Sequence, residues 1–139
     1  MIRVLCVDDS VDISELIGRV IRDQPDMELV GALASADNLT EECARVRPQV
    51  VLLDLHMPGT PPLEALKELS AAAPAVRVIV FSGLDDGETV DRAVRAGAWG
   101  LVPKVATTDA VLDAIRRVAA GEVSVPDYAA GPTWGWYST

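Results

Sequence analysis

The stretch VVLLDLHMPG at residues 50–59 decides how the rest of the chain is interpreted. It begins with four consecutive apolar residues, and an unbroken apolar run is typical of a strand covered on both faces in a parallel sheet. Asp54 follows the run directly, and a proline and a glycine then indicate a loop. We therefore predict a buried parallel strand over Val50–Leu53 whose carboxyl end carries an acidic side chain.

The same kind of segment recurs along the chain. Further apolar runs rich in Val, Ile and Leu predict strands at Ile2–Val7, Met27–Ala34, Val76–Phe81 and Trp99–Val102. Apolar residues at helical spacing lie between and after them, at Val11–Asp23, Leu39–Val46, Leu63–Ala72, Thr89–Ala96 and Ala110–Ala120. This (βα)5 alternation predicts an α/β fold, a doubly wound parallel sheet with the flavodoxin-like strand order 2-1-3-4-5.

Polar and small residues mark the ends of several predicted helices. Ser10 is placed to cap the first helix, and Thr107 or Thr108 is placed to cap the last. Gly97 and Gly121 stand where glycines commonly end helices. The helix boundaries are thus supported by capping residues as well as by spacing.

Composition restricts the class of protein. A chain of 139 residues that is 50% hydrophobic can bury a single core without disulfides. Its 12 basic and 21 acidic side chains give a formal charge of -9, so we expect neither direct nucleic-acid binding nor membrane association. No apolar run approaches the roughly 18 residues of a membrane span.

Cys6 and Cys43 are expected to be reduced thiols of a cytoplasmic protein.

The segment after Gly121 lacks helical spacing. Residues 122–139 contain two prolines, two glycines and no basic residue, so we predict an extended or mobile tail after a domain at residues 1–121. The segment is too short for a helix-turn-helix module, which needs roughly 60 residues. We therefore expect no output domain in it.

Polar side chains follow four of the predicted strands. Since the carboxyl ends of parallel strands meet at one edge of a sheet, these residues should share a crevice at the topological switch point. Each alone could be a helix cap, a turn residue or a solvated charge, but together they indicate a site. Its expected members are Asp8 and Asp9 after the first strand, Asp54 after the third, Ser82 after the fourth and Lys104 after the fifth.

Three carboxylates in one crevice repel one another. Without compensation at least one of them would retain its proton well above the ordinary pH range of a carboxyl group. A hard cation removes this conflict, and Mg²⁺ prefers oxygen ligands while keeping sites open for water or a phosphoryl oxygen. Asp8, Asp9 and Asp54 therefore predict a magnesium site.

Four segments carry a resemblance to a known family. They are the pair Asp8–Asp9, VVLLDLHMPG around Asp54, VIVFSG at residues 78–83, and AGAWGLVPK at residues 96–104. In this order, and after these predicted strands, they resemble the receiver domain of two-component response regulators, which has a CheY-like fold. The resemblance covers residues 2–121.

The resemblance implies roles for the acidic residues. Asp54 is similar to the aspartate that accepts a phosphoryl group in this family. Asp8 and Asp9 correspond to the acid pair that binds Mg²⁺ together with that aspartate, and the backbone carbonyl of His56 would complete the protein ligands. The His56 side chain itself is expected to face solvent and to tune hydrolysis.

Two further residues match the family pattern. Ser82 corresponds to the hydroxyl that contacts the phosphoryl group, and Lys104 to the lysine that pairs with it. Phosphoryl transfer needs mainly in-line positioning and charge stabilisation, because its transition state is loose and its charge lies on the peripheral oxygens. In this family a cation, the hydroxyl that Ser82 matches and the lysine that Lys104 matches supply the positioning and the charge stabilisation.

The chain also departs from the family pattern. Leu101 occupies the position, three residues before the lysine, that usually holds an aromatic residue coupled to the hydroxyl. Trp99 is expected on the same strand face, either packed between the last two helices or exposed as an anchor for a partner. Without the aromatic relay, we expect the backbone of residues 83–87 to carry the change on phosphorylation. The run Thr60–Pro62 stiffens the loop beside the site.

The expected function is a phosphorylation switch without catalysis on an external substrate. A histidine kinase or phosphotransfer protein would supply the phosphoryl group. An unknown downstream protein would then read the new state, and a homodimer could form through the fourth helix, fifth strand and fifth helix.

Two alternatives stay open. One is a receiver-like interaction module that works without phosphorylation. The other is the truncated receiver of a helix-turn-helix transcription factor, or a descendant that lost its output domain, because AAGEVSVPDYA at residues 119–129 resembles the linker of that branch.

Two enzyme classes fit poorly. Haloacid dehalogenase phosphatases need a second aspartate two residues after the nucleophile, where this chain has Ser10 or His56. A dinucleotide-binding domain would need a G-x-G-x-x-G run after the first strand, and none is present.

Overall fold

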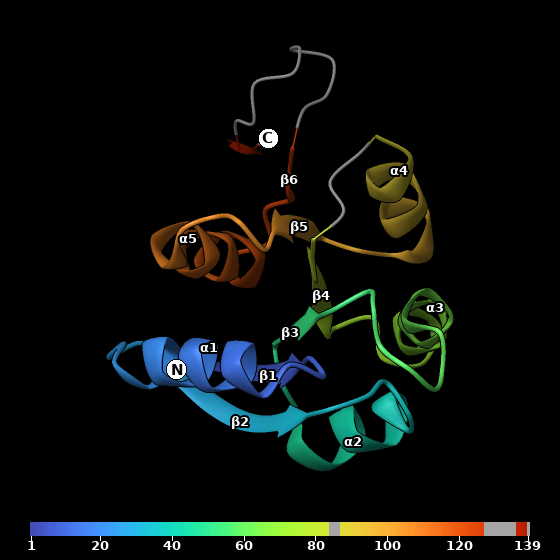
Figure 1. Cartoon of the computed structure of the whole chain (residues 1–139), viewed down its shortest axis with the longest axis horizontal. Helices are drawn as coiled ribbons and strands as arrows, with labels where there is room; N and C mark the ends of the chain where they lie inside the picture. Colours follow the sequence, from blue (N-terminus) through green and yellow to red (C-terminus); the bar gives the residue numbers. More distant parts are fainter. Residues whose placement is uncertain (84–86, 127–135, 139) are drawn as a thin grey trace.

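The computed structural model describes residues 1–83, 87–126 and 136–138, and its central feature is one sheet (Figure 1). The described part contains seven strands in the order β2-β1-β3-β4-β5-β6-β7. The strands are β1 Ile2–Val7, β2 Met27–Leu33, β3 Val50–Leu53, β4 Arg77–Ser82, β5 Gly100–Pro103, β6 Ser124–Pro126 and β7 Trp136–Ser138. The first five are parallel in the order 2-1-3-4-5, which confirms the predicted fold class and strand order.

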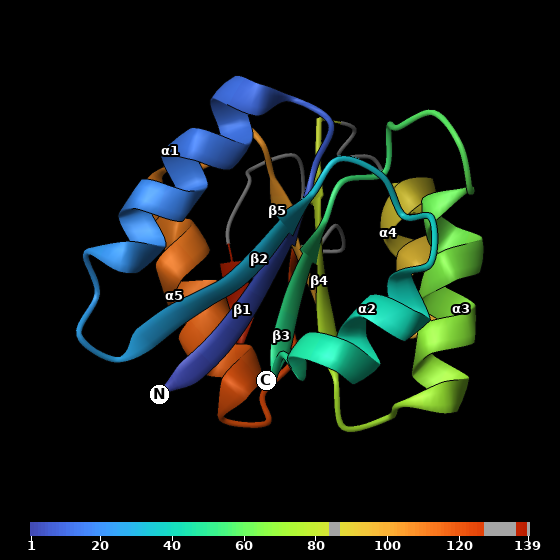
Figure 2. The same ribbon diagram turned by 90° about the horizontal axis from the view of Figure 1, so that it is seen from below.

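Helices cover both faces of this sheet. They are α1 Val11–Arg22, α2 Leu39–Val46, α3 Pro62–Ala72, α4 Gly87–Ala96 and α5 Thr108–Ala119. α1 and α5 lie on one face, and α2, α3 and α4 lie on the other (Figures 1 and 2). No helix of the described residues is long and apolar enough to cross a membrane.

Alternation along the buried strands supplies one hydrophobic core to each face. Val50 and Leu52 of β3 belong to the cluster under α1 and α5. Val51 and Leu53 belong to the cluster under α2, α3 and α4. Successive side chains of a strand point to opposite faces, so a continuous apolar run is what a sheet with two covered faces requires.

Most predicted helix ends are present in the structure. The Ser10 hydroxyl accepts a hydrogen bond from the Ile13 N–H at 3.3 Å, and the Thr107 hydroxyl accepts one from Ala110 N–H at 3.2 Å. Gly97 and Gly121 have φ values of +112° and +92°, the left-handed region that favours glycine. Thr107, rather than Thr108, is therefore the cap of α5.

The sheet is longer than the sequence predicted. β6 pairs in parallel with β5, with Gly100 opposite Ser124, and the Ser124 N–H donates to the Trp99 carbonyl at 2.9 Å. β7 then pairs antiparallel with β6. The prediction of five strands was too low, because three-residue strands carry too few residues to show alternation and depend on the β5 edge for pairing. Residues 127–135 and 139 of the predicted tail lie outside the described residues, and the division into a domain and a tail stays a prediction.

Trp99 differs from its predicted position. It is half-buried and packs on the cluster beside α5, whereas Leu101 is fully buried in the opposite cluster. The prediction that the two share a strand face is wrong, because β5 begins only at Gly100 and strand alternation does not extend back to Trp99. The Arg77 guanidinium lies 4.5 Å from the centre of the Trp99 ring and also donates to the Val118 carbonyl of α5 at 2.9 Å.

The other prediction for this region concerned the loop at residues 83–87. Residues 84–86 of that loop lie outside the described residues. The expectation that its backbone carries the change on phosphorylation stays a prediction.

Candidate functional site

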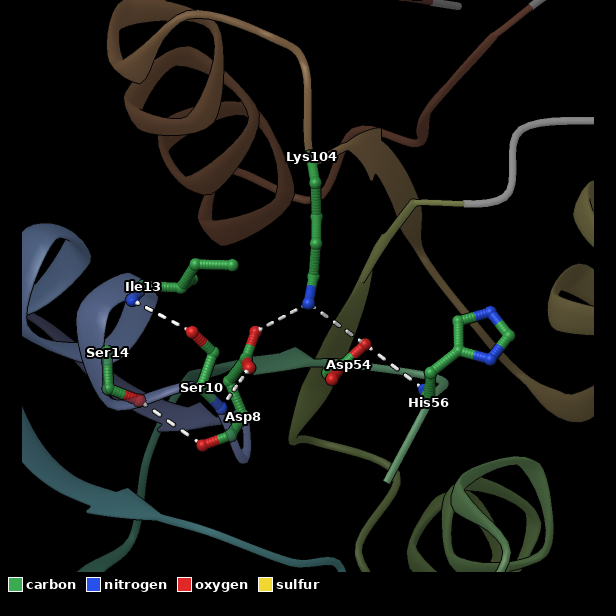
Figure 3. A network of polar contacts seen from close by, with 7 residues as sticks. All are labelled: Asp8, Ser10, Ile13, Ser14, Asp54, His56 and Lys104. Carbon is green, nitrogen blue, oxygen red and sulfur yellow. Dashed lines mark hydrogen bonds and ion pairs between the residues drawn. The ribbon is translucent and has the colours of Figure 1, made fainter. Parts of the chain in front are cut away.

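Four of the predicted residues, Asp8, Asp54, His56 and Lys104, lie close together at the carboxyl edge of the parallel strands (Figure 3). Backbone hydrogen bonds hold the two buried aspartates just beyond their strands. The Asp8 N–H donates to the Leu33 carbonyl at 2.9 Å and the Asp54 N–H donates to the Val7 carbonyl at 2.9 Å. The strand ladders thus continue one residue further and place the two carboxylates side by side.

Lys104 joins the two buried carboxylates. Its Nζ lies 3.1 Å from Asp8 Oδ2 and 3.3 Å from Asp54 Oδ1. Asp8 is 3% exposed and Asp54 is 1% exposed, so neither charge is screened well by water. The Lys104 N–H also donates to the Ser82 carbonyl at 2.8 Å, which ties the start of this loop to the end of β4. One ammonium group therefore compensates two carboxylates only in part.

The hydrogen bonds of the carboxylates leave one oxygen without a donor or an ion pair. Asp8 Oδ1 accepts from the Ser10 N–H at 2.9 Å, and Asp54 Oδ1 accepts from the His56 N–H at 3.1 Å. Asp8 Oδ2 has no hydrogen bond but lies in the ion pair with Lys104. Asp54 Oδ2 is buried with no hydrogen-bond partner among the described residues and is outside both ion pairs. Buried polar atoms almost always have a hydrogen-bond partner, so a buried oxygen without one indicates a position where a ligand binds. The lone pairs of Asp54 Oδ2 are available for that purpose.

Asp9 completes the acidic cluster from its exposed side. One carboxylate oxygen from each of Asp8, Asp9 and Asp54 lies within 4.8 Å of the others. An open hollow of about 290 Å³ borders Asp8 and Asp9 between α1 and β2. A donor set made only of carboxylate oxygens, one of them without a partner, fits a hard cation such as Mg²⁺.

Asp54 and Lys104 shift each other's pKa. Burial raises the pKa of Asp54, and the neighbouring Asp8 charge adds to this, while the His56 N–H and Lys104 oppose it. Burial alone would lower the pKa of Lys104, but the carboxylates of Asp8 and Asp54 outweigh it and raise the pKa. Lys104 thus stays protonated, while the ionised form of Asp54 is disfavoured and would be stabilised by a further positive charge.

The remaining predicted residues are also at this edge. Ser82 is fully buried at the end of β4. His56 follows Asp54 and contributes its main-chain N–H, while its exposed imidazole points away from the carboxylates (Figure 3). The predicted site residues therefore all lie at one edge of the sheet, Ser82 as the last residue of β4 and the others in the loops that follow their strands.

Sequence reasoning missed two contacts in the first loop. The Ser10 N–H bonds to the Asp8 carboxylate, and the Ser14 hydroxyl donates to the Asp8 carbonyl at 3.3 Å. The sequence pattern predicts Ser10 only as a helix cap. An aspartate two residues before a capping serine was the available signal, because such a side chain can bond to the backbone N–H two residues on.

Fold and site together define a signalling domain of the receiver class. The family model described as "Response regulator receiver domain" matches residues 4–116. The chain belongs to this family and is a receiver domain of the two-component signalling systems.

Its relatives are longer response regulators. The chain is 32% identical over 121 residues to the uncharacterized transcriptional regulatory protein YxjL of Bacillus subtilis (strain 168), covering 87% of this chain and 56% of the relative. It is 33% identical over 122 residues to the response regulator GacA of Pseudomonas aeruginosa, covering 88% and 57%. The chain thus spans just over half the length of these relatives.

Solved structures share the fold. The response regulator domain of Thermotoga maritima CheB superposes with a TM-score of 0.79 at 30% identity, covering 86% of this chain and 97% of that one. The signal receiver domain of the putative response regulator NarL from Mycobacterium tuberculosis gives a TM-score of 0.82 at 26% identity, with the same coverage.

Proposed function

We propose that Asp54 accepts a phosphoryl group from a phosphohistidine on a histidine kinase or phosphotransfer protein. The observation that carries the proposal is the buried Asp54 carboxylate, whose Oδ2 has no hydrogen-bond partner in the part of the chain that the structure describes, while Lys104 and an acid pair lie beside it. A carboxylate oxygen with available lone pairs is the nucleophile that such a transfer requires.

The phosphoryl group moves from the donor imidazole to Asp54 in one displacement. An oxygen of the Asp54 carboxylate forms a bond to phosphorus, and the P–N bond of the donor breaks. The electron pair of that bond stays on the donor imidazole, which takes up a proton from solvent. The negative charge that collects on the peripheral phosphoryl oxygens is stabilised by Lys104, whose Nζ is already 3.3 Å from the Asp54 carboxylate.

Other residues of the edge support this step. Mg²⁺ held by Asp8, Asp9, Asp54 and the His56 carbonyl would neutralise charge on the phosphoryl oxygens. The His56 N–H orients the acceptor by holding Asp54 Oδ1. We assign to the Ser82 hydroxyl the contact with the incoming phosphoryl group, because Ser82 ends the strand next to β3.

The output is a protein interaction that depends on phosphorylation, in the cytoplasm and without catalysis on an external substrate. The names of several relatives include transcriptional regulation, so this chain could serve as the receiver part of such a regulator. A homodimer through α4, β5 and α5 would have to accommodate β6, which occupies the β5 edge.

The test replaces Asp54 by asparagine. Asp54→Asn keeps the shape of the side chain but removes the nucleophilic oxygen, so incorporation of acid-labile phosphate from acetyl phosphate with Mg²⁺ should fall to background. Asp26→Asn, at the opposite end of the strands, serves as the matched control and should incorporate phosphate normally. Undiminished incorporation in Asp54→Asn would refute the assignment, and no incorporation in the wild type would favour an interaction module that works without phosphate.

A further inference from the structure

A second aspartate outside the acidic cluster contacts the loop that carries the site. Asp37 lies in the turn between β2 and α2, and its Oδ1 accepts a hydrogen bond from the Thr60 N–H at 2.9 Å. Thr60 is separated from it by 23 positions and lies in the loop that follows Asp54. The contact therefore joins two loops at the edge of the sheet where the site lies.

The loop is shaped to receive this carboxylate. Gly59 has a φ of +94°, which other residues rarely adopt, and a Cβ added to it would lie 2.9 Å from Asp37 Oδ1. Only a glycine therefore allows the carboxylate to approach the backbone this closely. On its own loop, Asp37 is held by its N–H, which donates to the Ser35 hydroxyl at 3.3 Å.

The loop runs from Leu55 to Pro61, and its Leu55 and Met57 side chains pack against the core under α2, α3 and α4. Its backbone has few hydrogen bonds among the described residues, and one of them lies near its start, where the His56 N–H donates to Asp54 Oδ1 at 3.1 Å. Pro61, at the start of α3, makes no side-chain cap. Neither Pro61 nor Pro62 has an N–H with which to fix the loop. The hydrogen bond to Asp37 thus anchors the far end of a segment whose near end positions the acceptor.

We propose that Asp37 is a positioning residue for the phosphoacceptor site. By accepting the hydrogen bond from the Thr60 N–H next to Gly59, Asp37 acts as a clamp on the loop, so that the His56 N–H stays on Asp54 and the His56 carbonyl stays within reach of a cation. This inference rests on the proposed function for its consequence in phosphoryl transfer, but its structural part does not. The bonds from Thr60 also lower the pKa of Asp37, so the clamp is an ionised carboxylate at neutral pH.

The first experiment measures amide hydrogen exchange by NMR without Mg²⁺ or a phosphoryl donor. In Asp37→Ala, the amides of Thr60 and His56 should both exchange about tenfold faster, as expected for loss of a hydrogen bond that restrains the segment. Asp37→Asn keeps the acceptor oxygen and should restore slow exchange. Asp26→Ala, which removes a half-buried aspartate paired with Arg116 at the other end of the sheet, is the control and should leave both amides unchanged.

The second experiment measures Mg²⁺ affinity by calorimetry. Residues that support metal ligands from outside typically contribute tenfold or more to affinity, so Asp37→Ala should bind Mg²⁺ about tenfold more weakly and Asp37→Asn nearly normally. Gly59→Ala keeps Asp37 but places a Cβ against its carboxylate. The His56 amide of this variant should therefore exchange faster, as it does in Asp37→Ala.

The outcomes separate the two proposals. Faster exchange at Thr60 with unchanged exchange at His56 and unchanged Mg²⁺ affinity would overturn the positioning role, because Asp37 would then fix only its local turn. Faster exchange at both amides in a protein that takes no phosphoryl group on Asp54 would support the clamp and refute the proposed function.

Discussion

Gly97, directly after α4, has a backbone conformation that few other residues tolerate. Its φ is +112°, and an added Cβ would lie 2.9 Å from the Ser70 Cβ of α3. Gly97→Ala should therefore destabilise the protein by about 1–3 kcal/mol through backbone strain, with further loss from the contact with α3. Thermal unfolding followed by circular dichroism measures the change.

Gly83 provides the comparison for that experiment. A Cβ added there meets no atom of the described residues within 4 Å, so Gly83→Ala should change stability by no more than about 0.5 kcal/mol. Equal losses of stability in Gly97→Ala and Gly83→Ala would show that the backbone conformation of Gly97 does not require a glycine.

The two cysteines are expected to be inert at neutral pH. Both are buried, and burial raises the pKa of Cys6 and of Cys43 from 9.0 to about 11, with Asp8 and Glu42 adding to the respective shifts. Below pH 9 both thiols keep their protons in the folded and unfolded chains, so they contribute no pH dependence. Between pH 9 and 11 the unfolded chain loses these protons first, and stability should fall as the pH rises.

This pH dependence is measured by urea unfolding across that range. In a variant with both cysteines replaced by alanine, the free energy of unfolding should fall less over this pH range, because the other groups titrate equally in both proteins. Native protein should also resist a thiol reagent at pH 8, whereas rapid labelling before unfolding would contradict the assigned burial.

At the scale of elements, β6 closes the edge of β5. The contact depends on Gly100, because a Cβ there would lie 2.9 Å from the Ser124 carbonyl oxygen. Gly100→Ala should therefore weaken the pairing and speed exchange of the Ser124 amide, which donates to the Trp99 carbonyl. An uncovered strand edge favours pairing between chains, so light scattering should show more self-association in this variant.

Gly31 is the matched control in another strand. Its added Cβ would meet only the end of the Leu5 side chain, at 3.1 Å, and that side chain can move. Gly31→Ala should leave the Ser124 amide unchanged. Slow exchange of this amide in Gly100→Ala would show that β6 does not need the glycine.

Arg77 links β4, α5 and the Trp99 ring just before β5 at the end of the sheet away from the site. From the start of β4 its guanidinium donates to the Val118 and Ala119 carbonyls of α5 and lies over the Trp99 ring. It thus satisfies terminal carbonyls of α5 close to where the chain enters β6. Trp99 fluorescence should accordingly report on this end of the sheet rather than directly on the loop after Ser82.

At the scale of the whole molecule, a divalent cation should stabilise the fold. Asp8, Asp9 and Asp54 add to the negative charge of a protein whose formal charge is -9, and burial already disfavours ionised Asp54. A cation concentration 100-fold above Kd would stabilise the folded state by about 2.7 kcal/mol. The melting temperature should rise by several degrees in millimolar Mg²⁺ at neutral pH, and less at acidic pH, where the carboxylates take up protons.

Calorimetric scans of wild type and Asp9→Ala test this expectation. Asp9 is exposed, so the variant should fold normally and lose most of the shift. An equal shift in both proteins would place the cation elsewhere.

From the sequence alone it was possible to predict the class of fold and that Asp8, Asp9, Asp54 and Lys104 lie close together, whereas their roles in a site stay a prediction. Unbroken apolar runs such as Val50–Leu53 can be satisfied only where both faces of a strand are covered, and this condition is local and visible in the chain. Once the strands are parallel, residues such as Asp54 and Lys104 must reach the same edge. Pattern and topology were therefore sufficient to assemble the predicted residues.

The tertiary structure decided which atoms meet. The pairing of Lys104 with two carboxylates, the bond from Thr60 to Asp37 and the pairing of Ser124 beside Gly100 all join segments far apart in the chain. Such contacts depend on distances of a few ångströms, which are set by how strands and helices pack around them. No periodicity within a segment records those distances, so they become visible only in the folded chain.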